Sequence, residues 1–310
     1  MTKRIIILSF LLSTLTVANQ KQDFSFSIGT VNGKAGEYVY DPDTGQKISY
    51  LNWEIKNIPV LIGEYRYHYN NFETGIKFKK NFSRTSSGRM KDYDWYSPED
   101  EEAKEEDYGK PLAFSDNKNY VENLFSFDIN TKYWFNYNEY LKTGPVLGVK
   151  YDYFKFKGKG GDQYDYELNG EYDISRGTGR DSIVYRQKFL TPYLGYAVVY
   201  SREKWTTNFE VKGSYYGKAK GQDRHLERGF NETKEKYKNI KSLNLEFQTA
   251  YALTSSLDLN AGIEFVKYFK NKKSTSDFIS DEGEKENGIK NLAGLKNMTY
   301  TISTGITCKF

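Results

Sequence analysis

Apolar and polar residues alternate along most of this chain, and the last run, Tyr300 to Phe310, shows the pattern most clearly. One side of that run carries Tyr300, Ile302, Thr304, Ile306, Cys308 and Phe310. The other side carries Thr301, Ser303, Gly305, Thr307 and Lys309. A period of two is typical of a β-strand with one face in an apolar medium and the other in a polar one. Such segments lie at roughly 24–35, 47–69, 72–83, 119–138, 141–158, 182–200, 205–219, 238–253, 257–270 and 295–310.

The first residues have the features of a secretory signal peptide. Lys3 and Arg4 precede an apolar run from residue 5 to 17, and small residues suit cleavage near Ala18. We therefore interpret residues 1–18 as a signal peptide and residues 19–310 as a single domain. An uncleaved anchor is the alternative, but the run falls short of the ~20 residues that span a bilayer. No other window approaches that length, so the apolar medium predicted for the strands is an outer-membrane bilayer.

Short turns and long polar connections alternate strictly between the predicted strands. The turns lie at 70–71, 138–140, 201–204 and 254–256, and the long connections at 36–46, 84–118, 159–181, 220–237 and 271–294. In outer-membrane barrels the short turns face the periplasm and the long loops face outward. The predicted fold is therefore all-β, a ten-stranded antiparallel transmembrane β-barrel with five long extracellular loops. Two segments are about twice the ~9–11 residues that cross a bilayer, which predicts a barrel projecting above the membrane.

Composition agrees with this interpretation. The mean hydropathy of -0.76 suits a barrel because only alternate residues of the membrane segment face lipid. Aromatic residues make up 17% of the chain, as expected if they form girdles at both membrane interfaces. One cysteine excludes an intramolecular disulfide and a thiolate metal cluster. The net charge of +4 is too small and too evenly spread to indicate a nucleic-acid partner.

Two predicted loops carry residues that suit acid–base chemistry. Asp92 and Asp94 lie in the second, and Asp223 and His225 in the fourth. In an extended segment, residues i and i+2 point to the same side, so each pair can act together. A carboxylate beside an imidazole fixes its tautomer and raises its basicity, which suits a general base. The second histidine, His68, is predicted at a periplasmic turn as an ordinary interfacial side chain.

Simpler readings of these pairs remain open at this point. An Asp-x-Asp in a loop is usually a solvated turn, and the acidic stretch from 99 to 107 is consistent with a charged surface. Calcium favours clustered carboxylates, but the spaced glycine of an EF-hand loop is missing. The chain has no Gly-x-Ser-x-Gly and no His-Glu-x-x-His, which disfavours a serine nucleophile and zinc. The remaining hypothesis is a water molecule activated by carboxylates and an imidazole.

Longer stretches of the chain resemble the omptins, outer-membrane endopeptidases of Gram-negative bacteria built on a ten-stranded barrel. The resemblance extends from about Phe24 to Phe310. The stretches that carry it are Ser27-Ile28-Gly29-Thr30, Gly33-Lys34 with Glu37, Leu51-Asn52-Trp53, Asp92-Tyr93-Asp94-Trp95, Phe127-Asp128-Ile129-Asn130 with Trp134, Tyr185-Arg186-Gln187-Lys188-Phe189, Pro192-Tyr193-Leu194-Gly195 and Asp223-Arg224-His225.

The resemblance implies a protease without a covalent intermediate and without a cofactor. Asp92 and His225 are expected to flank the attacking water, and Asp223 to orient His225. Asp94 is expected to pair with Asp92 and to help manage protons and charge. The family prefers to cleave between two basic residues in cationic peptides and proteins, and Glu37 matches a carboxylate that receives the P1 cation. The alternative is a catalytically inactive adhesin or invasin on the same barrel; a narrow passive porin is less favoured.

The sequence also departs from the family pattern. Omptins often have a second acid two residues before the aspartate of the fourth loop, and that place is Gly221 here. Selectivity for a basic P1 residue is therefore expected to be weaker. Omptins also need lipopolysaccharide, and Lys188 and Lys238 occupy places where basic residues are expected. Apolar and aromatic residues near 149–153 put that lipid requirement in question.

Overall fold

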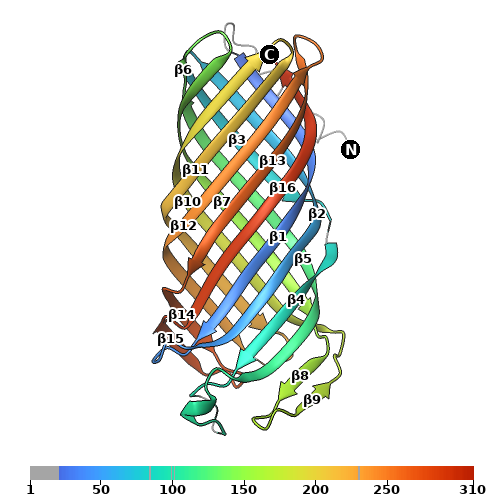
Figure 1. Ribbon diagram of the computed structural model, residues 1–310, viewed down its shortest axis with the longest axis vertical. Coiled ribbons are helices and arrows are strands. Elements are labelled where there is room, and N and C mark those ends of the chain that lie inside the picture. The colour runs from blue at the N-terminus through green and yellow to red at the C-terminus, as the bar shows by residue number, and fades with distance from the viewer. Residues whose placement is uncertain (1–20, 84, 99, 101, 230) are drawn as a thin grey trace.

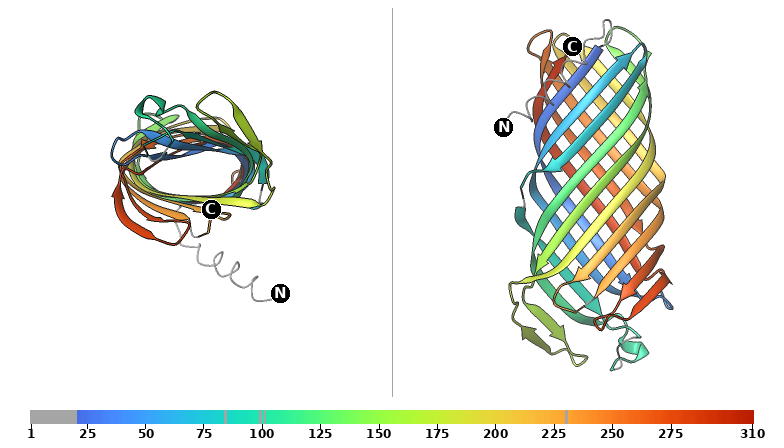
Figure 2. Two further views of the ribbon diagram at one scale, coloured as in Figure 1. Left: turned by 90° about the horizontal axis from the view of Figure 1, so that it is seen from below. Right: turned by 180° about the vertical axis from the view of Figure 1, so that it is seen from behind.

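The computed structural model describes residues 21–83, 85–98, 100, 102–229 and 231–310. The predicted signal peptide, residues 1–18, lies outside this part of the chain. The described residues form a closed ten-stranded antiparallel barrel, as predicted (Figures 1 and 2). No helix in the described ranges is long and apolar enough to cross a membrane.

The barrel strands follow one another around the wall in chain order. They are β1 (Lys21–Tyr40), β2 (Lys47–Tyr69), β3 (Phe72–Asn81) with β4 (Thr85–Trp95), β5 (Pro111–Tyr133) with β6 (Phe135–Asn136), β7 (Leu141–Lys159), β10 (Asp181–Arg202), β11 (Trp205–His225), β12 (Glu232–Ala252), β13 (Leu257–Asn271) and β16 (Ala293–Lys309). β3 and β4 share one place in the wall because both pair with β2 and with β5. Pairing of β16 with β1 closes the barrel.

Smaller elements decorate the end of the barrel opposite the C-terminus. They are a 3-10 turn, η1 (Glu105–Asp107), and the hairpins β8 (Gln163–Tyr166) with β9 (Tyr172–Ser175) and β14 (Ser274–Ile279) with β15 (Lys285–Lys290). The first hairpin pairs with β5 and the second with β12. Both extend from the long-loop end, at the bottom of Figure 1, whereas the short turns lie at the top.

The strands are longer than the alternation predicts, and the predicted loop bounds were wrong in consequence. β1 continues to Tyr40, β11 to His225, and the segment predicted as the second long loop contains β4 and the start of β5. The physical reason is the solvent. Where a strand rises above the membrane, water bathes its outer face, so apolar side chains are no longer required there while backbone pairing continues. The two sequence motifs therefore lie on strands, not in loops.

Outward-facing apolar side chains gather in the half of the barrel near the short turns. Phe24, Phe26 and Ile28 of β1 are 47%, 44% and 55% exposed. Farther along the same face, toward the long-loop end, β1 carries the exposed Lys34. The outer face of β16, which pairs with β1, changes in the same way, from the exposed Ile302 near the short turns to Lys296 nearer the long-loop end. The strands thus span the membrane with their short-turn half and continue beyond it.

Charged side chains fill the lumen inside this belt, and they do so in pairs. Lys132 lies 3.1 Å from Glu73 and also contacts Glu210 across the lumen. Lys212 lies 2.8 Å from Glu210 and 3.3 Å from Glu246. All five side chains are at most 6% exposed. Enclosed charges are tolerated here because each has an opposite charge beside it.

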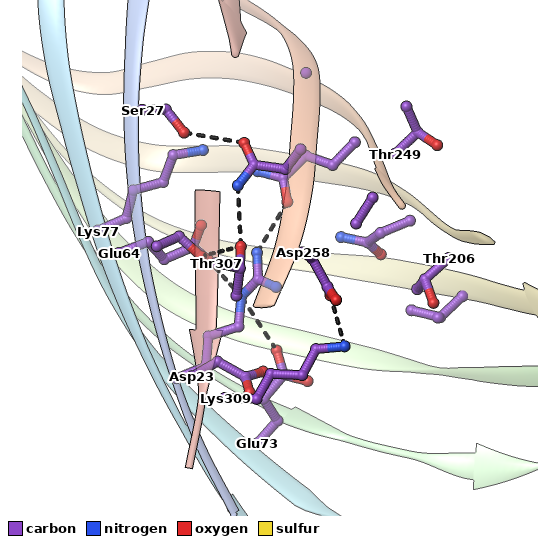
Figure 3. A pocket seen from close by; sticks show the side chains of 18 of the residues that line it. Asp23, Ser27, Glu64, Glu73, Lys77, Thr206, Thr249, Asp258, Thr307 and Lys309 are labelled. Carbon is purple, nitrogen blue, oxygen red and sulfur yellow. Dashed lines mark hydrogen bonds and ion pairs between the residues drawn. The ribbon is translucent and has the colours of Figure 1, made fainter. Parts of the chain in front are cut away.

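Glu264, which belongs to the same ionic layer, links three strands of the barrel. It lies on β13 and accepts hydrogen bonds from Lys79 of β3, at 2.7 Å, and from Lys150 of β7. Nearer the short turns the lumen opens into a polar pocket, where Lys309 points toward Asp258 at 2.6 Å (Figure 3). Glu73 and Lys132 of the ionic layer line this pocket, and the rest of the layer lies farther toward the long-loop end.

Stacked aromatic rings form the next layer toward the long-loop end. The Trp53 ring lies 5.5 Å from Phe156 and 5.8 Å from Tyr185, between centroids. Phe189 and Tyr268 stack at 3.9 Å. Together with the ionic layer, these rings occupy much of the interior, which disfavours the porin alternative. They also form a rigid floor for the open end of the barrel.

The ionic layer generates a stability prediction. Glu264→Ala leaves Lys79 and Lys150 without this buried partner, so we expect the free energy of unfolding to fall by roughly 3–5 kcal/mol. Denaturant unfolding in detergent, followed by tryptophan fluorescence, measures it. The control is Lys236→Ala, which removes an exposed pair with Asp277 and is expected to cost less than about 1 kcal/mol. Equal losses in the two variants would contradict this account.

Candidate active site

Four residues singled out from the sequence line one cleft at the long-loop end. Asp92 and Asp94 face it from β4, and Asp223 and His225 face it from β11. β4 and β11 are not neighbours in the sheet, so closure of the barrel brings the two pairs together. Within each pair, alternate residues of a strand point to one side, as predicted.

His225 and Asp223 form a hydrogen-bonded pair. Nε2 of His225 lies 3.0 Å from Oδ2 of Asp223. The other oxygen, Oδ1, is buried and has no hydrogen-bond partner in the described structure. The end of β11 is held in place because the His225 amide donates to Asn231 and the Leu226 amide to Ser182. The carboxylate can therefore orient the imidazole while its second oxygen remains available.

Asp92 and Asp94 lie beyond the apolar belt but remain shielded from water. Burial raises the pKa of both carboxyl groups, and the neighbouring charges of Asp94 and Asp223 raise the pKa of Asp92 further. Arg228 opposes these shifts. Ser49 Oγ donates a weak hydrogen bond to Asp92 Oδ1 at 3.4 Å. Because two close carboxylates resist double ionisation, the pair is suited to hold one proton near neutral pH.

Two more carboxylates lie close to Asp223: Glu37, which lines the cleft, and Glu235, which is buried. Trp53 Nε1 donates to Glu37 Oε2 at 3.3 Å, and burial together with the charges of Asp223 and Glu235 raises the pKa of Glu37. Glu235, on β12, accepts a hydrogen bond from the Tyr237 hydroxyl at 2.6 Å. Burial, with a smaller effect of Asp223, raises the pKa of Glu235 to about 8.

Nothing in the residue pattern pointed to Glu235. It falls within the segment predicted as the fourth long loop, among several charged residues of the same kind. Its place near Asp223 follows from the register of β12 against β11, in which it lies opposite Gly221. A correct strand assignment would have placed it on the inner face with Tyr237, and that alternation was the one available signal.

The cleft continues past the two motifs to a second wall. Asp92, His225 and Arg228 line this part too, together with Met90, Ile183 and glycine-rich backbone at 160–161. An extended chain can therefore lie across the motifs with groups on both sides. No group of three or more His, Cys, Asp or Glu in the described ranges is arranged to hold a metal ion.

Comparison with known proteins identifies the family. The sequence profile of the Omptin family matches residues 19–310. The chain belongs to the Omptin family. The plasminogen activator of Yersinia pestis is 28% identical over 284 residues, 92% of this chain and 88% of that protein. The outer membrane protease OmpP of Escherichia coli K12 is 25% identical over 303 residues, 94% of this chain and 91% of that protein.

A solved structure agrees with the fold. The outer membrane protease OmpT from Escherichia coli superposes with a TM-score of 0.85 at 20% identity, covering 94% of this chain and 97% of that one. This omptin is accordingly an outer-membrane protein, and its protease relatives support a protease function and peptide or protein substrates. The resemblance noted from the sequence motifs is confirmed at the level of family and fold.

Other residues noted in the sequence lie outside the omptin cleft. His68 lies at the short-turn end, where its Nε2 is 2.9 Å from Asp23. Lys188 and Lys238 are exposed on the outer wall. Of the acidic stretch, residues 99 and 101 are outside the described ranges, and Asp100 reaches the cleft. Among the described residues of the stretch, Asp100 alone lines the cleft with the four motif residues and Glu37.

The raised pKa values predict how stability depends on pH. A carboxyl whose pKa is raised by folding stabilises the protein fully below its ordinary pKa, and this contribution is lost as pH rises through the folded value. For Glu235 the window runs from about 4.5 to about 8. We expect the thermal midpoint in detergent to fall across this window, and to fall less steeply in Glu235→Gln, which cannot ionise. Circular dichroism melts at several pH values test this, and parallel curves for the two proteins would refute it.

Proposed function

We propose that this omptin is an endopeptidase that uses a water molecule activated by Asp92 and His225. His225 takes a proton from the water as its oxygen attacks the peptide carbonyl carbon, and Asp223 orients the ring and stabilises the imidazolium. Breakage of the C–N bond then returns that proton to the leaving amine. Asp94 pairs with Asp92 and helps to manage the charge of the tetrahedral intermediate. No covalent intermediate and no cofactor take part.

One observation carries this proposal. A hydrogen-bonded His–Asp pair and a carboxylate pair meet in one solvent-open cleft, although they come from strands that are not neighbours. Solvated surface turns, the simpler reading of these motifs, have no reason to converge in this way. The carboxyl groups also differ from those of free surface acids, since burial raises the pKa of both Asp92 and Asp94. Perturbed groups gathered in a cleft are typical of acid–base sites.

We further propose that the substrates are cationic peptides and protein segments cut at basic, preferably dibasic, sites. Glu37, Asp92, Asp94, Asp223 and Asp100 give the cleft a negative lining. A recessed site lined by one sign of charge concentrates ligands of the other sign. In this proposal Glu37 receives the P1 cation. The cleft faces the cell exterior, because it lies at the end carrying the long connections.

A hydrolysis assay tests the catalytic proposal. The refolded barrel is given a fluorogenic peptide with an internal Arg-Arg or Lys-Lys bond, with and without lipopolysaccharide. Removing a general base costs about 10²–10⁴-fold, so we expect a loss of that size in kcat/KM for His225→Ala. His68→Ala, which changes the other histidine of the chain at the far end of the barrel, is the control and should remain active. A folded native barrel that is inert toward every basic peptide would overturn the protease proposal in favour of the adhesin alternative.

The outer wall supports a proposal about lipid. Exposed Lys188 on β10 lies opposite Lys220 on β11, which lies opposite Lys236 on β12; Lys218 is likewise opposite Lys238. Like charges directly opposite each other destabilise a sheet unless an anion neutralises them. We propose that phosphate groups of outer-membrane lipid, lipopolysaccharide in particular, bind these lysines above the apolar belt. The apolar residues near 149–153 then contribute less than the neighbouring strands.

Charge removal tests the lipid proposal. Lys188→Gln with Lys220→Gln removes two charge-assisted contacts worth about 1.5–3 kcal/mol each. We expect the lipopolysaccharide concentration for half-maximal activity to rise by at least about tenfold. Lys204→Gln, an exposed lysine at the short-turn end, is the control and should leave it unchanged. Full activity of the native barrel in lipid-free detergent would count against any lipid requirement.

A further inference from the structure

The carboxylate of Glu235 occupies the space that a side chain at position 221 would need. Gly221 on β11 and Glu235 on β12 are register partners. A Cβ atom built on Gly221 would lie 2.0 Å from Oε2 of Glu235, far inside any normal contact. The glycine therefore has a structural consequence beyond the absence of an acid. It leaves room for an acid that arrives from the neighbouring strand.

Glu235 is enclosed without a neutralising cation. Its side chain is 3% exposed and accepts a hydrogen bond from Tyr237, but no ion pair joins it to a Lys or Arg in the described structure. Glu37, also 3% exposed, likewise has a hydrogen bond from Trp53 and no ion pair there. The charge of Asp223 acts on both of these acids, and its buried Oδ1 has no hydrogen-bond partner among the described residues.

The ionic layer of the same barrel supplies an internal comparison. There, the equally buried Glu210, Glu246 and Glu264 each contact two lysines. Burying a carboxylate without a cation is costly, and its raised pKa is the sign of that cost. Glu37 and Glu235 both show such raised pKa values. Among the described residues, no cation pairs with either carboxylate, so a cation from outside the chain can fill that place.

We infer that Glu235 is, with Glu37, the second carboxylate of the P1 pocket, and that the cation of a basic P1 side chain binds between them beside Asp223. This inference rests on the proposed endopeptidase function and specifies how its substrate is selected. It replaces the expectation that Gly221 weakens P1 selectivity, since the second charge is retained and comes from β12 in place of β11.

The position of the carboxylate adds a preference among cations. The carboxylate of Glu235 lies near the place where the Cβ of residue 221 would be. An acid side chain at position 221 would place its carboxylate farther into the pocket than this. The pocket with Glu235 is therefore deeper than one with an acid at 221. A guanidinium, with a longer reach and five donors in a planar fork, can engage carboxylates on two sides. An ammonium is a compact point charge. We therefore expect Arg to be preferred over Lys at P1.

Paired substrates test the inference. Peptides that differ only in P1, as Arg, Lys or Gln, are compared on the refolded barrel with lipopolysaccharide present. Glu235→Gln keeps the size of the side chain and an oxygen for the Tyr237 hydroxyl. We expect it to lower the Arg-to-Gln ratio of kcat/KM by about ten- to a hundredfold. Glu232→Gln is the matched control, because it removes the same charge from an outer-facing residue of β12 that pairs with Lys234. It should leave the ratio unchanged.

Relocating the acid provides a rescue. Gly221→Asp combined with Glu235→Ala restores a second carboxylate from β11 and should recover the Arg-to-Gln ratio while reducing the preference for Arg over Lys. Gly221→Asp alone is expected to perturb the site, because Glu235 fills the space. Binding of the P1-Arg peptide to His225→Ala, measured by calorimetry, gives a readout that needs no turnover and should weaken when Glu235→Gln is added.

The outcomes separate the two proposals. A folded native barrel that cleaves none of the peptides overturns the endopeptidase function itself. Cleavage of the P1-Arg peptide with the same Arg-to-Gln ratio in native protein and Glu235→Gln leaves that function standing and overturns the role of Glu235. An equal fall of the Arg-to-Gln ratio in Glu232→Gln would attribute the effect to overall charge. That result would also overturn the role of Glu235.

Discussion

A barrel this narrow must neutralise the charges that it encloses, and this requirement divides its interior into two regions. At membrane level, lysines and glutamates from different strands pair across the lumen, as Glu264 does with Lys79 and Lys150. Because each of these glutamates contacts lysines of other strands, the layer ties distant parts of the wall together. At the open end, Glu37 and Glu235 have no such partner among the described residues. In our proposal, these two acids without a cationic partner are what make that end a receptor for the cation of a basic substrate.

The aromatic layer between these two regions holds one of the cleft carboxylates in position. Trp53 stacks near Phe156 and Tyr185, and its indole N–H donates to Glu37. A cleft carboxylate is thus oriented by a ring whose own position is fixed by packing. Active sites must hold reacting groups to within fractions of an ångström, and they depend on such packing and hydrogen bonds around those groups. The strands, and not flexible loops, carry the motif residues for the same reason.

The sequence predicted the class of fold well and the ends of its strands poorly. Alternation identified the membrane-spanning part of the barrel wall because, within the membrane, lipid demands apolar side chains on one face. Above the membrane that demand disappears, and β4 and the distal part of β11 were mistaken for loops. The omptin motifs were recognised in spite of this, since their identity depends on residue type and order. The roles assigned to Asp92, Asp94, Asp223 and His225 remain proposals that the shared cleft supports.

The sequence by itself determined the period-two pattern, the alternation of short turns with longer connections, and which residues within a strand share a face. These are local properties, set by backbone geometry over a few residues. Only the tertiary structure decided which distant side chains meet. Pairing of β11 with β12 brings Glu235 to Gly221, and closure of the barrel brings Glu37 and the β4 aspartates to the same cleft. Register and closure arise from the whole sheet at once, so no local pattern of residues records them.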